Sequence, residues 1–261
     1  MRILHNISLN FGPPDKKLFS EAGVNVELGL STFRISEDDA RWPKICSLVQ
    51  RYRAVDVSWT RFTASELDSA KYIALVPTWH HGYPQPEKDF AYRSITYDSS
   101  ELCESCGTGL RQIAPFRFLR PRIWGKKAVL QLNWVFDEYF VKPDVWGSVF
   151  KPLGIGCMPV LLHKSGAVID SVVQLENKLT VDLHLNGFDF EQCPACGRSK
   201  YLPVTRGYHP KPSETDLSIF RSTQYFGSGA SANKAVIVSA ALYRRIRDTN
   251  LKGVDFLACA S

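Results

Sequence analysis

Four of the seven cysteines occur in two short motifs of matching spacing. The motifs are Cys103-Glu-Ser-Cys106-Gly107 and Cys193-Pro-Ala-Cys196-Gly197. Two residues between the cysteines let both sulfurs of a tight turn face one ion, and the following glycine can take the positive φ that folds the chain back toward them. Four thiolates complete a tetrahedral Zn²⁺ shell with no open position for water. The spacing therefore predicts one structural zinc site formed by two knuckles.

Two other interpretations of these cysteines stay open: a redox dithiol and free buried thiols. A redox pair usually follows a strand and opens a helix, whereas both pairs here lie in polar or loop contexts and end in glycine. The long insert between the knuckles is compatible with a shared ion because the entropy cost of closing a loop grows only logarithmically with its length. Cys46, Cys157 and Cys259 stand alone and are predicted to be small core residues.

The composition is that of an ordinary globular chain. It has 261 residues, 44% hydrophobic and 22% charged, with a formal net charge of +6. A chain of this length can bury a core without disulfides. No apolar run reaches the roughly 18 residues that a membrane span needs, and the N-terminus lacks the apolar stretch of a secretory signal. We therefore expect a cytoplasmic protein without a membrane partner.

Strands and short helices alternate irregularly along the chain, which predicts an α+β fold of mixed sheets with short helices. Apolar spacing predicts a helix that begins near Pro43, and Thr63-Ala-Ser-Glu66 has the spacing of a capping box that opens another. Residues 1–35 are interpreted as strand and loop, with a break at Gly12-Pro13-Pro14. Strands are predicted at 72–76, 127–135, 168–175, 179–186, 219–226 and 235–238, and Ser239 is predicted to cap a helix over 240–248.

The chain is divided into an N-terminal α+β region, residues 1–100, and a double-knuckle region, residues 101–261, which could form one continuous domain. Residues 141–158 align without gaps to residues 238–255, at an offset of 97. Apolar residues and one glycine coincide in the alignment. The alignment predicts an internal duplication in residues 101–261. Each half would be one knuckle–strand–helix–strand unit, and the two knuckles would share the metal.

The sequence carries none of the short catalytic motifs of serine hydrolases, zinc proteases or phosphate-binding loops. Asp137 and Glu138 are adjacent, and neighbouring side chains on a strand face opposite ways, so we do not expect them to form an acid–base pair. These absences predict that the protein is not an enzyme. A deep pocket with converging titratable side chains would instead favour an enzyme with a structural zinc.

The segment from Arg111 to Lys127 holds six basic residues among Phe116, Phe118 and Trp124. Interleaved basic and aromatic residues are typical of nucleic-acid contacts, but sheet strands can have the same pattern without that role. A nucleic-acid-binding zinc-ribbon protein is therefore the alternative function, although nucleic acid is not the partner that we expect.

The chain resembles the double-CxxCG-motif family, abundant in myxobacteria and assigned as immunity proteins of contact-dependent toxin systems. The matching features span residues 60 to 257: the two knuckles, Ser65-Glu66-Leu67 with Ala70, Asp216–Arg221, Val236–Ser239 and Leu251–Phe256. The resemblance implies a cytosolic protein that binds and neutralises one cognate toxin. It implies no catalysis and no small-molecule substrate.

A protein of this class needs a surface complementary to its partner, and a few aromatic and arginine anchors carry most of the binding energy in such surfaces. The loop aromatics Trp79, Tyr83 and Tyr208 are the predicted partner-binding residues. Inhibitors of nucleases are commonly acidic, whereas this chain is basic. The charge therefore favours an acidic toxin, one that is not a nuclease, or one bound away from its catalytic cleft.

Overall fold

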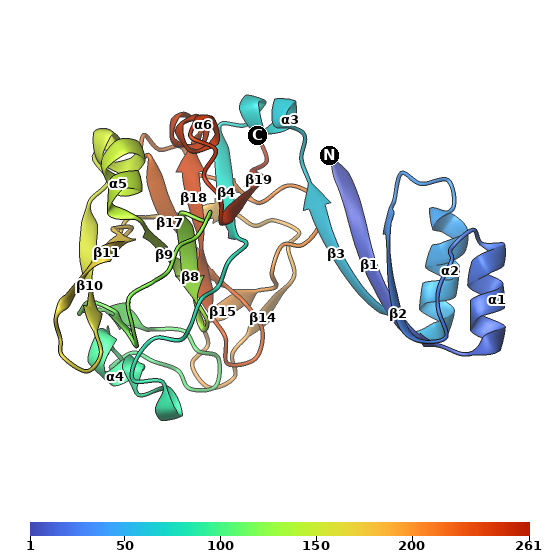
Figure 1. Ribbon diagram of the computed structural model, residues 1–261, viewed down its shortest axis with the longest axis horizontal. Helices are drawn as coiled ribbons and strands as arrows, with labels where there is room; N and C mark the ends of the chain where they lie inside the picture. Colours follow the sequence, from blue (N-terminus) through green and yellow to red (C-terminus); the bar gives the residue numbers. More distant parts are fainter. The chain divides into compact units, whose positions relative to one another are not determined.

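The computed structural model describes all 261 residues and divides into two compact units (Figure 1). Unit 1 contains Met1–Glu66 and Val204–Tyr208, and unit 2 contains Leu67–Pro203 and His209–Ser261. The chain is mixed α+β, as the sequence predicts. The main segment of unit 1 ends at Glu66, whereas the sequence-based division is at residue 100, so the residues from Leu67 to the first knuckle belong to unit 2.

Unit 1 is a three-stranded antiparallel sheet in the order β2-β1-β3, with two helices on one face (Figure 1). The strands are β1 (Arg2–Phe11), β2 (Gly29–Ser36) and β3 (Val55–Arg61), and the helices are α1 (Pro13–Glu21) and α2 (Trp42–Tyr52). Ile7 and Phe11 of β1 pack against Phe19 of α1 and Ile45 of α2. Burial of this face alone accounts for the side on which the helices lie.

Helix α1 corrects the sequence interpretation, which has only strand and loop in residues 1–35. Gly12-Pro13-Pro14 begins this helix and does not interrupt the chain: both prolines lie in the first turn, where their missing N–H groups cost nothing. The Asp15 carboxylate accepts a hydrogen bond from the Gly12 backbone N–H at 2.9 Å. A proline pair was therefore a helix start signal here.

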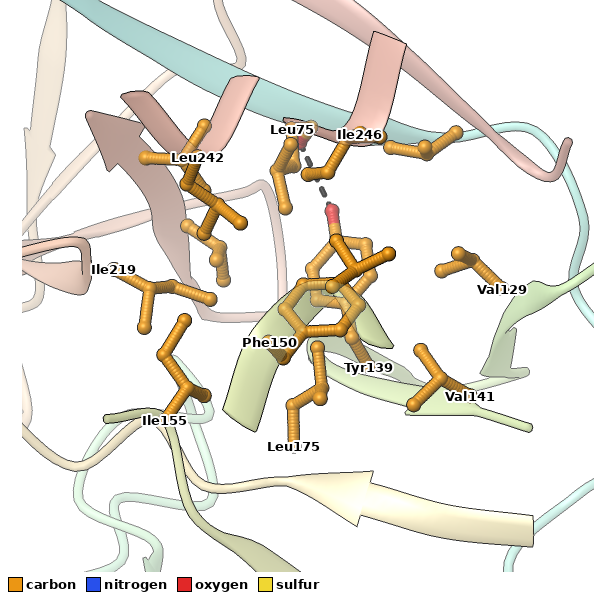
Figure 2. Close-up of a cluster of buried hydrophobic side chains, with 14 of the residues drawn as sticks. Leu75, Val129, Tyr139, Val141, Phe150, Ile155, Leu175, Ile219, Leu242 and Ile246 are labelled. Atoms are coloured by element: carbon orange, nitrogen blue, oxygen red, sulfur yellow. Dashed lines mark hydrogen bonds between the residues drawn. The ribbon is translucent and has the colours of Figure 1, made fainter. Parts of the chain in front are cut away.

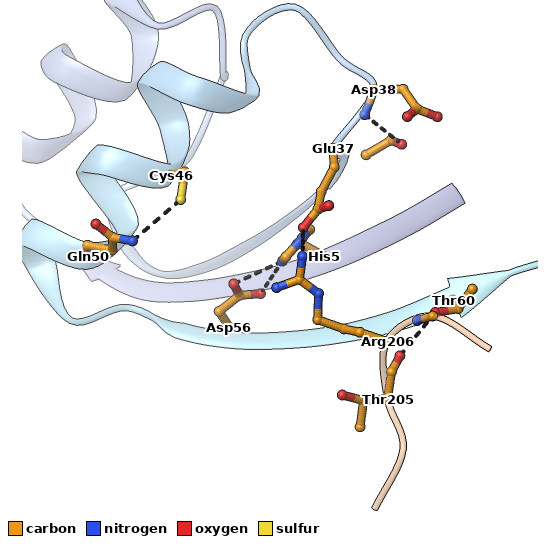
Figure 3. A network of polar contacts seen from close by, with 11 residues as sticks. His5, Glu37, Asp38, Cys46, Gln50, Asp56, Thr60, Thr205 and Arg206 are labelled. Atoms are coloured by element: carbon orange, nitrogen blue, oxygen red, sulfur yellow. Dashed lines mark hydrogen bonds and ion pairs between the residues drawn. The ribbon is translucent and has the colours of Figure 1, made fainter. Parts of the chain in front are cut away.

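A polar network lies beside the core of unit 1 (Figure 3). The His5 ring is 3% exposed and stacks on Trp42 with 4.0 Å between ring centroids. Its Nδ1 lies 2.9 Å from both Asp56 carboxylate oxygens, and its Nε2 lies 3.0 Å from Glu37 Oε1. The same Glu37 oxygen accepts from the Arg206 guanidinium, which joins the 204–208 segment to the sheet.

Unit 2 holds two larger sheets. One has the order β14-β15-β17-β18-β4-β19, with β12 paired to β17, and the other has the order β7-β10-β11-β9-β8. The strands of the first are β4 (Tyr72–Pro77), β12 (Thr180–Val181), β14 (Phe190–Gln192), β15 (Ser199–Tyr201), β17 (Ile219–Phe226), β18 (Asn233–Ser239) and β19 (Val254–Ala258). Those of the second are β7 (Arg117–Phe118), β8 (Val129–Leu132), β9 (Val135–Val141), β10 (Cys157–Leu162) and β11 (Val168–Leu175).

Short helices and two small ribbons complete the chain. The helices are α3 (Ala64–Ser69), η1 (Lys88–Phe90), α4 (Tyr92–Thr96), α5 (Pro143–Val145), η2 (Trp146–Phe150), η3 (Lys151–Leu153) and α6 (Ala240–Asp248). The ribbons pair β5 (Tyr97–Asp98) with β6 (Arg111–Gln112), and β13 (Leu183–His184) with β16 (Lys211–Pro212). None of the helices reaches the length and apolarity that crossing a lipid bilayer requires.

The main core of unit 2 joins its two sheets and its helices (Figure 2). Leu75 of β4 and Val141 of β9 meet Phe150 of η2 and Leu242 of α6 in one buried cluster. The Tyr139 hydroxyl donates to the Leu75 carbonyl at 2.9 Å, so the one polar atom that this ring brings into the cluster is satisfied. A second cluster, around Phe116 and Phe140, packs on the other face of the five-stranded sheet, since the neighbours Tyr139 and Phe140 of β9 belong to different clusters.

The two helix N-caps predicted from the sequence are confirmed. Thr63 and Glu66 form the predicted capping box of α3, with the Thr63 N–H donating to Glu66 Oε2 at 2.8 Å and the Glu66 N–H donating to Thr63 Oγ1 at 3.3 Å. Ser239 caps α6 by accepting from the Leu242 N–H at 3.3 Å. Both are satisfied by residues within three positions, which is why sequence alone identifies them.

Two predicted strands differ in the structure. The predicted strand over 179–186 is wrong: this segment forms two short strands that pair with different partners, β12 with β17 and β13 with β16. Leu179 is 57% exposed, so the strict alternation there does not mark a buried face. The predicted strand over 127–135 ends at Leu132, where a tight turn starts β9.

The two segments aligned at an offset of 97 both fold as strand, helix and strand. Val145 and Val149 of the first and Leu242 and Ile246 of the second lie in the same core cluster. Their final strands pair differently, however: β10 lies between β7 and β11, whereas β19 pairs with β4. The internal duplication therefore stays a prediction.

Candidate metal centre

The two knuckles are the turns of two hairpins with the same backbone pattern. The first connects β5 to β6 and the second connects β14 to β15. In the first, the Cys103 N–H donates to the Thr108 carbonyl at 2.9 Å, and the Gly107 N–H donates to the Cys103 carbonyl at 2.7 Å. The second repeats both bonds, from Cys193 to Arg198 at 2.9 Å and from Gly197 to Cys193 at 2.8 Å.

The glycine of each knuckle is needed for its backbone conformation. Gly107 has φ 79° and Gly197 has φ 73°, in the left-handed region that other residues rarely occupy. At Gly107 the constraint is also steric, because a Cβ would lie 2.2 Å from the Ala230 carbonyl oxygen. The sequence predicted this role for both glycines.

The four sulfurs of the knuckles converge on one point. All four Sγ atoms lie within 4.8 Å of one another, although the two knuckles are 90 residues apart. The Cys103–Cys193 and Cys106–Cys196 sulfur pairs are each separated by 3.7 Å. A tetrahedral ion with metal–sulfur bonds of about 2.3 Å holds its sulfurs about 3.8 Å apart. The arrangement is therefore a plausible metal site, and the distances are far longer than a disulfide bond.

The surroundings shift the pKa values of the sulfurs in different directions. The Arg198 backbone N–H lowers the pKa of Cys196, but burial and the other three sulfurs outweigh it and raise this pKa to about 11, whereas backbone hydrogen bonds lower the pKa of Cys193. Burial by itself raises the pKa of Cys106, but hydrogen bonds from the Thr108 side chain and backbone outweigh it and bring this pKa down to about 6. The Thr108 hydroxyl lies 3.1 Å from Cys106 Sγ and is buried. Because the thiolate is the form that binds metal, the first knuckle presents one ligand in its reactive form near neutral pH.

Two basic side chains of the second hairpin contact the backbone of the first. Lys200 is 3% exposed, and its ammonium donates to the Cys106 carbonyl at 3.1 Å and to the Gly229 carbonyl. Arg198 donates to the Glu101 carbonyl at 2.7 Å. These contacts hold the second hairpin against the backbone of the first knuckle and bring two positive charges to the same part of the molecule as the cysteine cluster.

The other three cysteines take no part in the cluster. Cys259 is 5% exposed, as expected for a small core residue, while Cys46 of α2 and Cys157 of β10 are half-buried.

The three loop aromatics predicted to bind a partner lie in different settings. Trp79 packs on Trp124, with 5.8 Å between ring centroids, and lies under the Arg122 and Lys127 side chains, so much of its surface is covered. Tyr83 is 36% exposed and Tyr208 is 42% exposed. Tyr83 belongs to unit 2 and Tyr208 to unit 1.

The basic segment from Arg111 to Lys127 does not present its phenylalanines to solvent. Phe116 and Phe118 are 0% and 5% exposed and belong to the second core cluster, so nucleic-acid bases could not stack on them. Arg111 forms an ion pair with Asp98 at 2.6 Å. The alternation of basic and aromatic residues is explained here by the two faces of a sheet.

Two further surfaces were not found from the sequence. The first is the face of the unit 1 sheet opposite its helices, here called the open face. Its residues alternate along the three strands: Arg2, Leu4, Asn6, Ser8, Asn10, Leu30, Thr32, Arg34, Val55, Val57, Trp59 and Arg61. Leu30, Val55 and Val57 are 82%, 65% and 56% exposed. The alternation of these residues along each strand was the sequence signal that could have revealed this face.

The second is a cavity of about 810 Å³ in unit 2, lined in part by Asp137, Glu138 and Arg221. Asp137 and Glu138 were expected to face opposite ways, yet both carboxylates lie within 4 Å of the Arg221 guanidinium, at 3.9 and 2.6 Å. No hydrogen bond joins the two carboxyl groups, so the expectation that they do not form an acid–base pair stays a prediction. Burial raises the pKa of Glu138 to about 7, although the Arg221 charge opposes this shift.

Comparison with protein-family models, with curated proteins and with solved structures finds no match for this chain.

Proposed function

We propose that the protein is an immunity protein, stabilised by a structural zinc, that binds a cognate bacterial toxin in the cytoplasm. The observation that carries the zinc part is the convergence of four sulfurs from two hairpins of identical backbone pattern. The toxin-binding part rests on the resemblance to the double-CxxCG-motif family, whose defining motifs are these two knuckles.

Zinc is the proposed ion because of the ligand set. Four thiolates in tetrahedral geometry suit Zn²⁺ or iron. Zn²⁺ is preferred because it is the usual ion of structural four-cysteine sites and has no redox chemistry. Four protein ligands leave no position for a substrate, so the role of the ion is to join the hairpins and not to catalyse a reaction.

We propose that the partner binds the open face. Large exposed aliphatic side chains that share one sheet face mark interaction surfaces, and Leu30, Val55 and Val57 form such a group. The strand positions of this face carry three arginines and no carboxylate. Arg34 and Arg61 form no ion pair, and Arg34 lies 5.8 Å from the Trp59 ring centroid.

This charge pattern defines the chemistry of the partner. An acidic surface that also carries apolar side chains would complement the arginines and the aliphatic residues of the two outer strands together, and the charges would speed association. It also accounts for a basic immunity protein, because the toxin would contribute the acidic side. Tyr208, in the same unit, and Tyr83 remain candidate anchors.

The test is binding to the product of the neighbouring toxin gene. The wild-type chain should co-purify with that product, and Val57→Lys should weaken the complex at least about tenfold. Val168→Lys is the matched control, because Val168 is an equally exposed strand valine, 55% exposed, in unit 2. Equal loss with both variants, or none with either, would refute the assignment of the open face.

A different result would refute the immunity role itself. A toxin product that never binds, together with a salt-dependent shift of DNA or RNA by the pure chain, would replace the immunity role with the nucleic-acid alternative.

A further inference from the structure

The cavity in unit 2 has no place in the immunity role, because toxin binding requires an extended surface and not a pocket of small-molecule size. Its volume of about 810 Å³ falls within the range of small-molecule sites. One wall borders the first knuckle through Gly107 and Gly109, so the metal centre would help to fix its shape.

A fixed polar network forms one wall of the cavity. Glu138 is 1% exposed and accepts from the Gln174 amide at 2.8 Å and from Arg221 at 2.6 Å. Gln174 and Gln112 exchange two hydrogen bonds, at 2.8 and 3.0 Å. These side chains satisfy one another, so this wall is rigid before any ligand arrives.

The charges that line the cavity are balanced with one exception. Five cationic side chains line it, and four of them have a carboxylate within 4 Å: Arg93, Arg111, Lys178 and Arg221. The Lys234 ammonium has none, and its nearest recorded contact is the face of Tyr225, at 5.3 Å from the ring centroid. Burial and the neighbouring Arg221 lower the pKa of Lys234, which an anion would reverse.

Buried hydrogen-bonding atoms without partners occur in the same lining. Asn177 is 6% exposed, and neither its amide nitrogen nor its oxygen has a partner. The Nε of Arg221 is also buried without an acceptor. Unpaired buried donors are costly, and a bound acceptor would remove that cost.

Another part of the lining is aromatic and strained. Trp134 and Phe90 have φ values of 68° and 56°, in a region that bulky side chains rarely adopt, and their ring centroids are 4.5 Å apart. Phe90 is 43% exposed. Backbone strain of this kind clusters at ligand sites, where it holds side chains in position.

We propose that this cavity binds a small aromatic carboxylate, with the carboxylate on the Lys234 ammonium and the ring against Trp134 and Phe90. A monoanion fits because only one lining cation lacks a partner. A cationic ligand would meet Lys234 and find both carboxylates, Asp137 and Glu138, already engaged by Arg221. The sequence-based expectation of no small-molecule substrate did not include such a ligand.

The test uses the pure full-length chain and calorimetric titration with benzoate, phenylacetate, indole-3-acetate and phenylpyruvate, each against its neutral amide. At least one acid should bind with a Kd below about 1 mM and at least about tenfold more tightly than its amide. No binding by any acid, or equal binding of acid and amide, would overturn the proposal. No partner protein is present, so this result does not depend on the immunity role.

Variants of Lys234 and Phe90 test the two contacts proposed for the ligand. Lys234→Met should weaken the tightest acid at least about tenfold, and Lys252→Met, an exposed lysine paired with Asn250, should not change it. Phe90→Ala should weaken the acid and its amide alike, since it removes ring contact. Hydrogen exchange on each variant confirms the fold, and a folded Lys234→Met with unchanged affinity would refute the site.

Discussion

Unit 1 builds its sheet on a single apolar cluster, whereas unit 2 combines two apolar clusters with four converging cysteines. The difference follows from what each hairpin can bury. Every strand of unit 1 contributes to its core or to the His5 network. In unit 2, the knuckle-bearing strand β14 is exposed at all three positions. β14 pairs only with β15, at the edge of the larger sheet, and buries little surface there. A metal at the knuckle would therefore supply the stability that packing supplies elsewhere.

Replacement of one knuckle cysteine should give the largest loss of stability, and that loss should be confined to unit 2. Cys106→Ser removes a thiolate from the cluster, and we expect a loss of at least about 3 kcal/mol of stability in unit 2, with loss of bound metal. Hydrogen exchange should show faster exchange in the two hairpins and unchanged protection in unit 1. Cys46→Ser, in α2, is the matched control and should stay within about 0.5 kcal/mol of wild type. Equal protection in both variants would argue against a structural ion.

The buried carboxylate of unit 2 should give that unit a pH dependence. Glu138 has its pKa raised from 4.5 to about 7, so the native state holds a proton that the unfolded state releases. Its contribution to stability is then greatest below pH 4.5 and is lost as the pH rises toward 7. Glu138→Gln should remove this slope and make the variant relatively more stable at pH 8, by up to about 3 kcal/mol.

Urea unfolding at pH 5 and pH 8 measures this difference. Asp170→Asn is the matched control, because it removes the charge of an exposed carboxylate on β11. A wild-type advantage that grows between pH 5 and pH 8 would reverse the sign and contradict the account.

Lys200 should connect the metal centre to the rest of unit 2. Lys200→Met leaves the buried carbonyls of Cys106 and Gly229 without their donor, and we expect a loss of about 2 kcal/mol. Metal should be retained but released faster to a chelator. Lys252→Met serves as the exposed control, and identical chelation rates in the two variants would show that Lys200 does not support the knuckle.

The smallest effect should appear in unit 1. His5→Gln keeps a polar side chain but cannot meet both Asp56 and Glu37 as the imidazole does, and the carboxylates are partly exposed. We expect a loss of about 1 kcal/mol confined to unit 1. Thermal unfolding measures it, and metal content should not change. A loss of metal in this variant would show that the units are not independent.

The cysteine cluster could be predicted because each knuckle is local: the spacing of two cysteines and a glycine determines the turn. The capping signals of Thr63 and Ser239 are local for the same reason. That the two knuckles meet is a tertiary fact, and the prediction relied on the four-ligand requirement of zinc.

The cavity could not be predicted, because its side chains come from strands and loops far apart in the sequence. Glu138 and Arg221 are 83 positions apart and meet only through the packing of β9 against β17 and β18. The alternation over residues 179–186 misled for a related reason: pairing partners, and not local pattern, decide which face is buried.

The most direct test of the central claim is the metal content and sulfur coordination of the purified chain, measured by elemental analysis and zinc-edge X-ray absorption. The account predicts one zinc per chain with four sulfur neighbours at about 2.3 Å. A chain that is folded and free of metal, or one whose zinc has nitrogen or oxygen neighbours, would contradict it.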